Sequence, residues 1–443
     1  MKTFNGGIQL SCSKLTRANK IKPSFIPTKL IIPLLQNIGS TAKPVVKPGD
    51  TVLKGQVIAE SESYVSSKVH APTSGKILKI DYHPNPVYKK TQSLFLESDG
   101  EDKLLDSIKS KNTDLSMDRE KIINIVQNNG IVGLGGAAFP THVKLKAAQA
   151  DKQYYLIING AECEPFLTCD HRLMVERSEQ IVKGIEILEK VIACKKVYIA
   201  IEDNKREAIS SMKNILNKSE YQHSNIKKEV ITLKTKYPQG GEKQLVKAVL
   251  KKEVPPGKLP LDVNCMVQNV GTVLAIYQAV CNNMPLIERC VTLSGDCLSE
   301  NGNFQVRIGT ILSDLIKNRC NGFKTHPAKI IFGGPMMGIA QYGMDLPIIK
   351  GISGIVFLSE AAARIFEESP CIKCSKCVDI CPLRLLPTAI QKAVKKEDAD
   401  VLESLHISDC IECGACAYMC PSKIPLVQYV KVGKNIVRSK NAK

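Results

Sequence analysis

Hydrophobic positions in the middle of the chain switch repeatedly between helical and extended spacing. In "REKIINIVQNNG" (119–130) the apolar residues recur at helical intervals. "YYLIING" (154–160) is a continuous apolar run that ends at a glycine, and "KVYIAIEDN" (196–204) is a second strand with a helix after it. "EVITLKTKYPQGGEKQLVKAVL" (229–250) gives a strand, a glycine turn and a helix. This alternation predicts a Rossmann-like α/β domain over residues 118–286, with ligand loops at the carboxyl ends of parallel strands.

The flanking segments follow other patterns. Residues 1–99 are rich in Gly, Pro and Val, which predicts short strands and turns, and the polar residues 100–117 read as a linker. Residues 287–350 begin with a hairpin and a helix, followed by "AKIIFGGPMMG", a strand with a tight turn, which indicates a small β-grasp (SLBB-like) domain. Residues 351–443 predict a helical domain, in which "LRLLPTAIQKAVKKEDADVLESLH" reads as helix with a charged exposed face. The fold class is therefore multidomain, α/β with β.

The stretch "VKPGDTVLKGQVIAESESYVSSKVHAPTSGKILKI" (46–80) repeats a strand-and-turn pattern. Its G-D-x-V-x-x-G and A-P-x-x-G elements resemble the lipoyl/biotinyl barrel-sandwich family. In that family a lysine at a hairpin tip carries a swinging cofactor. The tip falls near Ser63 here and Lys68 is out of register, so the resemblance implies a scaffold and not a carrier.

Composition narrows the function classes. The chain of 443 residues is 44% hydrophobic and has no apolar stretch of 18 residues and no signal-like start, which predicts a cytoplasmic protein without a membrane span. The net charge is +18, but Trp is absent, aromatic residues are 5%, and no basic block is interleaved with stacking residues. We therefore expect no nucleic-acid partner; anionic lipid, an acidic protein or a nucleotide fits the charge equally well.

Cysteine spacing carries the strongest chemical signal. "CIKCSKCVDICP" and "CIECGACAYMCP" both read C-x2-C-x2-C-x3-C-P. This is the bacterial ferredoxin run, in which the fourth cysteine of each run ligates the other cluster, whereas zinc sites use pairs of C-x2-C. The sequence therefore predicts two [4Fe-4S] clusters in a ferredoxin-like module. The expected ligand sets are Cys371, Cys374, Cys377 and Cys420 for one cluster, and Cys410, Cys413, Cys416 and Cys381 for the other.

The stretch "GLGGAAFPTHVK" (133–144) begins with the pattern G-x-G-x-x-A. That pattern holds a dinucleotide phosphate when it follows a strand, and here it follows a helical segment. Glycines let backbone N–H groups converge on an anion, so a phosphate nest is plausible. A lone glycine-rich loop is more often a turn, and the pattern alone leaves both readings open.

Several segments, taken in order, resemble one family. "GLGGAAFPTHVK", "NGAECEP" (159–165), "YPQGGEKQL" (237–245) and "VQNVGT" (267–272) are similar to the FMN and NADH segments of the flavoprotein subunit of respiratory complex I. With "FNGGI", the barrel-sandwich region, "FGGPMMG" and the doubled cysteine run, they resemble the RnfC family, whose members belong to the Rnf complex, a membrane-bound ferredoxin–NAD oxidoreductase. The resemblance covers nearly the whole chain.

The resemblance implies FMN and NAD(H) as cofactors and assigns roles to named residues. Glu164 and Glu242 are the carboxylates assigned to catalysis, on the nicotinamide side and along the NADH channel. Leu134, Ala161 and Gly241 depart from the complex I pattern, so one basic and one acidic contact are missing. The residues implied to bind the cofactors are Gly133, Gly135, Gly136, Ala137, Phe139, Lys144, Asn159, Glu162, Tyr237, Gly240, Gly241, Asn269 and Thr272.

A flavin beside iron–sulfur clusters suits the conversion of two-electron into one-electron chemistry. The resemblance implies a ferredoxin:NAD+ oxidoreductase (translocase) subunit with NADH dehydrogenase activity. It would be peripheral on the cytoplasmic face of the cell membrane and bound to other Rnf subunits. Electrons would pass from ferredoxin, through those partners, to the clusters, FMN and NAD+, while the complex exports Na+ or H+. Two alternatives remain open: a soluble cobalamin reductase of a propanediol microcompartment, and a non-enzymatic ferredoxin-like relay.

Overall fold

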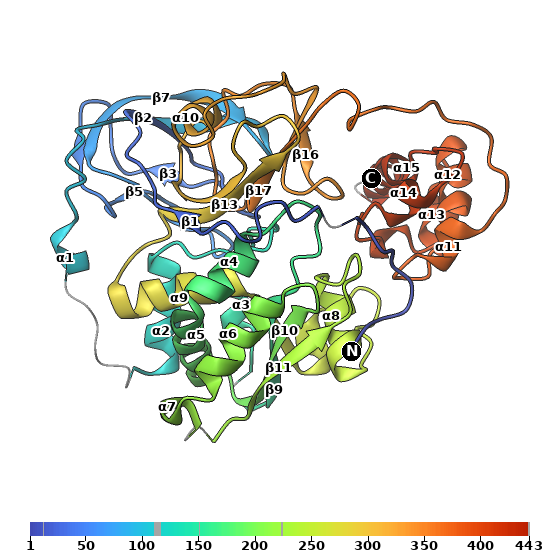
Figure 1. Ribbon diagram of the computed structural model, residues 1–443, viewed down its shortest axis with the longest axis horizontal. Helices are drawn as coiled ribbons and strands as arrows, with labels where there is room; N and C mark the ends of the chain where they lie inside the picture. The colour runs from blue at the N-terminus through green and yellow to red at the C-terminus, as the bar shows by residue number, and fades with distance from the viewer. Residues whose placement is uncertain (12, 110–116, 150, 223–224, 442–443) are drawn as a thin grey trace.

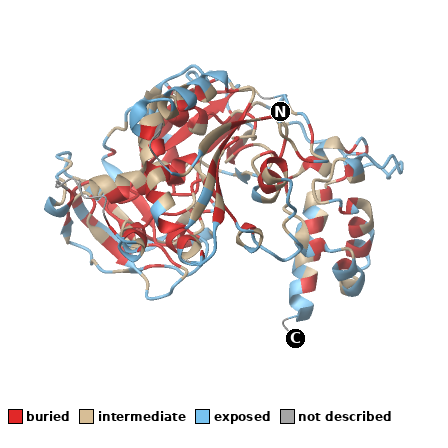
Figure 2. Ribbon diagram, turned by 90° about the horizontal axis from the view of Figure 1, so that it is seen from below, coloured by how far each residue is buried: buried red, intermediate tan, exposed pale blue. Residues whose placement is uncertain are grey.

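The computed structural model describes residues 1–11, 13–109, 117–149, 151–222 and 225–441. Figure 1 shows a mixed α/β molecule in which two sheet-rich parts lie together, a helix-covered sheet lies beneath them, and a helical domain stands to one side. Buried positions run through the middle of each part, and exposed positions cover the outer helices and loops (Figure 2). Among the described residues no helix is both long enough and apolar enough to cross a membrane.

The N-terminal part is built from short antiparallel strands, as the glycine and proline turns predicted. The strands pair in the orders β2–β8–β7–β4 and β3–β5–β6, and both sheets contribute side chains to one apolar core. Part of the expected linker packs here, since Asp102 pairs with Lys54 and Arg307; residues 110–116 lie outside the described residues. The elements are β2 (Lys29–Pro33), β3 (Lys43–Pro44), β4 (Thr51–Val52), β5 (Val57–Glu60), β6 (Val69–His70), β7 (Gly75–Asn85), β8 (Lys89–Ser98) and α1 (Asp106–Lys109).

The central part is the parallel α/β unit that the alternating pattern predicted. Its strands run in the order β11–β10–β9–β12, all parallel, and helices cover both faces, which is why β9 is apolar along nearly its whole length. The strands are β9 (Tyr154–Gly160), β10 (Cys194–Glu202), β11 (Lys228–Leu233) and β12 (Cys265–Asn269). The helices are α2 (Arg119–Asn128), α3 (Thr141–Lys146), α4 (Cys169–Glu176), α5 (Ser178–Val191), α6 (Arg206–Leu216), α7 (Ser219–Gln222), α8 (Glu242–Leu250), η1 (Pro260–Val263) and α9 (Val270–Asn282).

A mixed sheet follows, in the order β1–β14–β13–β17–β15–β16. The hairpin β13–β14 and the helix after it match the sequence pattern. Two strands come from outside residues 287–350: β1 joins from near the N-terminus, and β17 pairs with both β13 and β15. The elements are β1 (Ile21–Lys22), β13 (Glu288–Gly295), β14 (Gly302–Arg307), α10 (Leu312–Arg319), β15 (Lys329–Phe332), β16 (Ile339–Gln341) and β17 (Gly354–Leu358).

The C-terminal part is helical. The segment between the cysteine runs forms two helices and not one, because Glu397 has a positive φ of 53° and Asp398 then caps the next helix by accepting from the Val401 N–H. Its apolar core joins α12, α13 and α15. The elements are α11 (Lys376–Asp379), α12 (Pro387–Lys395), α13 (Ala399–Ser404), η2 (Ile407–Asp409), α14 (Ala415–Met419) and α15 (Leu426–Asn441).

The first residues of the chain connect the α/β unit with the helical domain. Ile8 exchanges backbone hydrogen bonds with Tyr237, and the Gly7 N–H donates to the Ile380 carbonyl at 2.7 Å. In Figure 1 this dark blue segment lies between α8 and the helical domain. The N-terminal segment therefore holds the first cysteine run against the edge of the parallel sheet.

Candidate functional site

The glycine loop follows α2 and has a fixed shape. The Gly133 N–H donates to the Phe139 carbonyl at 2.8 Å, and the Ala138 N–H donates back to the Gly133 carbonyl at 3.1 Å. The Leu134 N–H donates to the Thr272 hydroxyl at 2.9 Å, so Leu134, buried here, ties the loop to α9. The loop is thereby held as a compact turn across the start of α9.

Gly135, Gly136 and Ala137 lie at the exposed crest of this loop. Gly136 has φ = 111°, and a Cβ built there would meet nothing within 4 Å, so open space lies in front of it. Within the described part of the chain, the N–H groups of these three residues donate to no acceptor. Free N–H groups on an exposed crest fit an anionic group such as a flavin phosphate.

Asn159 and Asn269 end neighbouring parallel strands and organise the loops there. The Asn159 amide donates to the Gly240 carbonyl at 2.9 Å and accepts from the Ala161 N–H at 3.1 Å. Asn269 caps α9 by accepting from the Gly271 and Thr272 N–H groups, at 2.9 and 3.3 Å. These contacts bring the predicted segments to one edge of the sheet, at the carboxyl ends of its strands, where such folds bind ligands.

Lys144 and Glu242, predicted separately, meet in the structure. The Lys144 Nζ lies 2.5 Å from the Glu242 carboxylate and 2.6 Å from the Val267 carbonyl. Glu242 is the first residue of α8, just after Gly241. The ammonium therefore lies between the glycine turn and the strand β12. Phe139, also predicted here, is half-buried and shapes the loop through its backbone carbonyl.

The carboxylates of Glu162 and Glu164 both accept hydrogen bonds from backbone N–H groups of other segments. The Glu162 carboxylate accepts from the Asp170 and His171 N–H groups at the start of α4, at 2.8 and 3.2 Å. Glu164 accepts from the Met336 and Met337 N–H groups, at 3.0 and 2.8 Å, so it anchors the "GGPMMG" turn. Burial raises the pKa of Glu164 to about 7 and thus favours its protonated form.

Sequence patterns did not point to two residues that complete this region. Asp170 accepts from the Asn269 amide at 2.7 Å, and burial, followed by the nearby Glu162, raises its pKa to about 7. The Lys14 ammonium donates to the carbonyls of Glu162, Glu164 and Leu167 at 2.6–2.8 Å. Lys14 lies about 150 residues earlier in the chain and belongs to no motif, so only the folded chain reveals its place.

Each predicted set of four ligands brings together cysteines from both runs. Cys381 of the first run lines the same small apolar cavity as Cys410, Cys413 and Cys416 of the second. The pKa of the Cys377 thiol is raised by burial and then by the charges of nearby Cys420, Cys374 and Cys371. Four sulfur donors gathered at each of two places fit iron–sulfur clusters.

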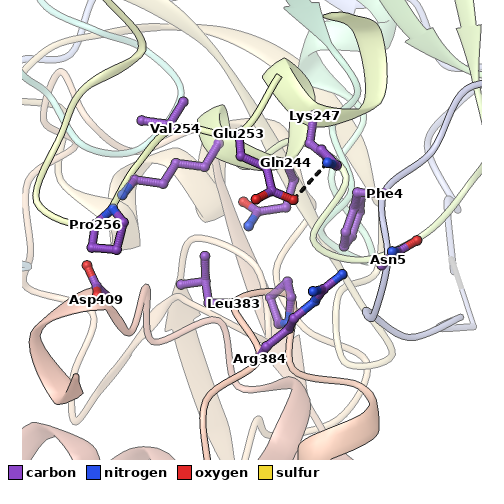
Figure 3. A pocket seen from close by; sticks show the side chains of 12 residues that line it. Phe4, Asn5, Gln244, Lys247, Glu253, Val254, Pro256, Leu383, Arg384 and Asp409 are labelled. Carbon is purple, nitrogen blue, oxygen red and sulfur yellow. Dashed lines mark hydrogen bonds and ion pairs between the residues drawn. The ribbon is translucent and has the colours of Figure 1, made fainter. Parts of the chain in front are cut away.

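One of these sets lies against the α/β unit. The Tyr237 hydroxyl donates to the Cys413 carbonyl at 2.7 Å, and Tyr237, Ile8 and Cys413 belong to one buried apolar cluster. Beside them is a cavity of about 230 Å³ between α8, the N-terminal segment and the turn after Cys381 (Figure 3). We call the set of Cys381, Cys410, Cys413 and Cys416 the inner set. Cys371, Cys374, Cys377 and Cys420 form the outer set, of which Cys371 and Cys374 are exposed.

Comparison with known proteins decides the family. Three family models match in succession: the RnfC barrel sandwich hybrid domain over residues 2–101, the Nuo51 FMN-binding domain over 126–278, and the 4Fe-4S dicluster domain over 370–424. The chain is 44% identical, over 97% of its length and 93% of the relative's, to the C subunit of the proton-translocating ferredoxin:NAD(+) oxidoreductase complex of Clostridium ljungdahlii. The chain belongs to the RnfC family.

Another family member supports this assignment, and two solved structures share the fold. The Na(+)-translocating ferredoxin:NAD(+) oxidoreductase complex of Acetobacterium woodii has a C subunit that is 41% identical over 100% of this chain and 98% of its own. NAD+-reducing [NiFe]-hydrogenase in the air-oxidised state shares the fold, with a TM-score of 0.52 and 15% identity over 75% of this chain and 68% of that one. The same hydrogenase in the H2-reduced state gives 0.51 and 16%, and the match spans 73% of this chain and 61% of the hydrogenase chain.

Proposed function

We propose that this RnfC family member passes electrons between NAD(H), FMN and two [4Fe-4S] clusters as the peripheral electron-transfer subunit of an Rnf-type complex. The hydrogen bond from Tyr237 to the Cys413 carbonyl is the main structural support, because it joins the FMN-binding domain directly to a cysteine run. A flavin bound there exchanges two electrons with NAD(H) and one at a time with iron–sulfur clusters. Both kinds of cofactor belong to domains of this chain that family models match.

The FMN assignment rests on the crest of the glycine loop. The free N–H groups of Gly135, Gly136 and Ala137 would hold the flavin phosphate, with Gly133 closing the turn behind them. The loops around these strand ends would supply the other residues that we assign to the flavin and the nucleotide. These are Asn159, Glu162, Tyr237, Asn269 and Thr272 on the flavin side, and Phe139, Lys144, Glu164, Gly240, Gly241 and Glu242 on the NAD(H) side.

The buried hydrogen bonds give Glu162 and Glu164 a positioning part in this proposal. Their carboxylates hold the start of α4 and the "GGPMMG" turn in place. Of the two carboxylates assigned to catalysis, Glu242 is the more open to solvent, at 45% side-chain exposure. In this proposal its ion pair with Lys144 would break, and Glu242 would contact a bound nucleotide instead. The domain organisation that we propose is the barrel-sandwich unit (1–99), a connecting segment (100–117), the Rossmann-like unit (118–286), the β-grasp unit (287–350) and the two-cluster domain (351–443).

The partners in this proposal are the other subunits of the complex. The relatives named above belong to ferredoxin:NAD(+) oxidoreductase complexes that translocate protons or Na+. By analogy this chain would take electrons that originate on ferredoxin and deliver them to NAD+, at the cytoplasmic face of the membrane. The exported ion, Na+ or H+, would cross through other subunits.

One experiment tests the flavin and NADH part of the proposal. After anaerobic iron–sulfur reconstitution of the purified chain, flavin is extracted and NADH oxidation is followed with ferricyanide as acceptor. We expect FMN close to one per chain and NADH-dependent reduction of ferricyanide. A chain that holds both clusters but neither retains FMN nor oxidises NADH would be a relay, and the proposal would be wrong.

A further inference from the structure

The two cysteine sets have unequal access to solvent. The inner set is covered by the N-terminal segment and the α/β unit, and Cys413 and Ala415 are buried in that contact. At the outer set, Cys371 and Cys374 are exposed. In Figure 1 the orange segment from β17 to α11 arches over the outer side of the helical domain before it reaches these cysteines. An electron carrier outside this chain can therefore approach the outer set more closely than the inner one.

Large apolar side chains gather beside the exposed cysteines. Ile365, Phe366 and Ile372 are 84%, 52% and 67% exposed. The segment that bears them is fastened to the second cysteine run, because the Ser369 N–H donates to the Ser422 carbonyl at 2.9 Å and the Ser422 hydroxyl donates to the Pro370 carbonyl at 2.9 Å. We call Arg364, Ile365, Phe366, Ile372, Lys373, Lys376 and Lys423 the outer patch.

Cations surround the apolar centre of the outer patch. The Arg364 guanidinium lies 5.2 Å and the Lys423 Nζ 4.8 Å from the centre of the Phe366 ring. Lys373 and Lys376 flank Cys374 and are exposed. Among the described acids nearby, Glu368 is engaged with Tyr429 and Lys395, whereas Glu367, next to Phe366, and Asp379, one turn from Lys376 on α11, are exposed. The outer patch is therefore an exposed aromatic centre with a mainly positive rim.

We propose that the outer patch is the docking surface for a partner protein domain that carries a one-electron redox centre and an acidic rim. This inference rests on the proposed function. Buried aromatic anchors contribute most of the affinity of protein interfaces, and opposite charge at the rim steers association. Anionic lipid would also attract a basic and apolar patch, but only a redox partner would make use of the exposed cysteines between these side chains.

The electron count agrees with this role. Each docking event moves one electron from the partner's reduced centre into this chain. NAD+ takes up two electrons and one proton to become NADH, so two such transfers complete one turnover. The partner is oxidised by the same number of electrons, and the chain returns to its starting state.

The test uses the assembled complex with a double variant, Phe366→Ala/Lys423→Glu. Neither residue is assigned to a cofactor. We expect ferredoxin-dependent NAD+ reduction to fall about tenfold, because an anchor and a steering charge are lost, while NADH–ferricyanide activity stays within about twofold. Added salt should slow the unaltered complex more than the variant, since salt screens the steering charges. The matched control is Tyr82→Ala/Lys90→Glu, an exposed aromatic and lysine on the barrel, which should change neither rate.

Other outcomes would contradict the inference. If the double variant keeps the ferredoxin-dependent rate and salt dependence of the control, and Ile365→Ser does too, the outer patch is not the docking surface. If the double variant instead loses binding to phosphatidylglycerol vesicles at an unchanged rate, the patch meets lipid. A complex without NADH–ferricyanide activity before any substitution would refute the proposed function itself, and the docking inference with it.

Discussion

Most side chains predicted for the candidate flavin site form hydrogen bonds with other residues of that site. Asn269 caps α9 with its carbonyl oxygen and donates its amide to Asp170, so one side chain fixes a helix start and a neighbouring loop. Glu162 holds the start of α4 through two N–H groups. A series of such hydrogen bonds fixes the conformation of a loop that has no regular secondary structure. The exposed N–H groups on its crest then stay available for a ligand.

At this scale, Gly135→Asp should abolish flavin retention. A Cβ at position 135 would lie 3.4 Å from the Asn269 Cβ, and the added carboxylate would repel a phosphate at the crest. We expect FMN affinity to fall at least about tenfold, or ~1.4 kcal/mol, with iron–sulfur absorbance unchanged. Flavin extracted per chain is the measurement. Gly343→Asp, which also adds an acid at an open position, is the control, and equal FMN content in both variants would refute the crest as the phosphate site.

At the scale of elements, short helices set which cysteines meet. In each run a short helix, α11 or α14, connects the first three cysteines to a fourth that lies near the cysteines of the other run. The two helices pack against each other, and Cys377 and Cys420 share one apolar cluster. The packing of α11 against α14 therefore brings the fourth cysteine of each run beside the first three of the other, as the proposed crossed ligation requires. Under this ligation each cluster would depend on both runs.

Cys420→Ser should accordingly damage the outer cluster, although it lies in the second run. A serine hydroxyl is a harder and poorer ligand for iron than a thiolate. EPR of the reduced protein should show the outer cluster changed or lost and the inner cluster retained. Cys281→Ser, on α9 and outside both sets, should leave both signals unaltered. A change confined to the inner cluster would show that the ligands do not cross.

At the scale of the whole molecule, one buried lysine joins three parts. The Lys350 ammonium donates to the carbonyls of Lys68 and Gly130, at 2.7 and 2.8 Å, and to the Ser67 hydroxyl at 3.0 Å. Its own carbonyl accepts from Arg289, whose guanidinium also donates to the Leu134 carbonyl at 3.3 Å. The barrel, the mixed sheet and the glycine loop are thus connected through Lys350 and Arg289. Burial lowers the pKa of Lys350 to about 7.

This burial makes stability depend on pH with a defined sign. Between about pH 7 and the ordinary lysine pKa of 10.5, the folded state binds fewer protons at Lys350 than the unfolded state, so stability rises with pH. Lys350→Met should remove that rise, so its cost in stability should grow as the pH is raised and reach about 1–3 kcal/mol near pH 10, where the carbonyl acceptors lose a donor. Unfolding midpoints at several pH values measure it, with exposed Lys47→Met as control. A cost that is the same at all pH values would contradict the role of burial.

The sequence predicts the structure of some parts of this protein better than that of others. The parallel strands, the helix before the glycine loop and the hairpin β13–β14 follow from periodicity, because each forms from neighbouring residues. The segment between the cysteine runs is helical as the pattern indicates, but the pattern does not reveal the break at Glu397 and Asp398 that divides it into two helices. The pairing of Lys144 with Glu242 was not predicted either, since the two lie 98 residues apart and no local pattern relates them.

The sequence by itself determined the spacing of the two cysteine runs, the order of the flavin segments and most element types, because each depends on a short stretch of chain. Only the tertiary structure decided that Glu162 and Glu164 serve the protein interior, that Lys14 holds their loop, and that the outer cysteine set is the exposed one. These features depend on contacts between residues up to 173 positions apart. Such contacts form only when the elements pack, and packing also leaves the outer patch open.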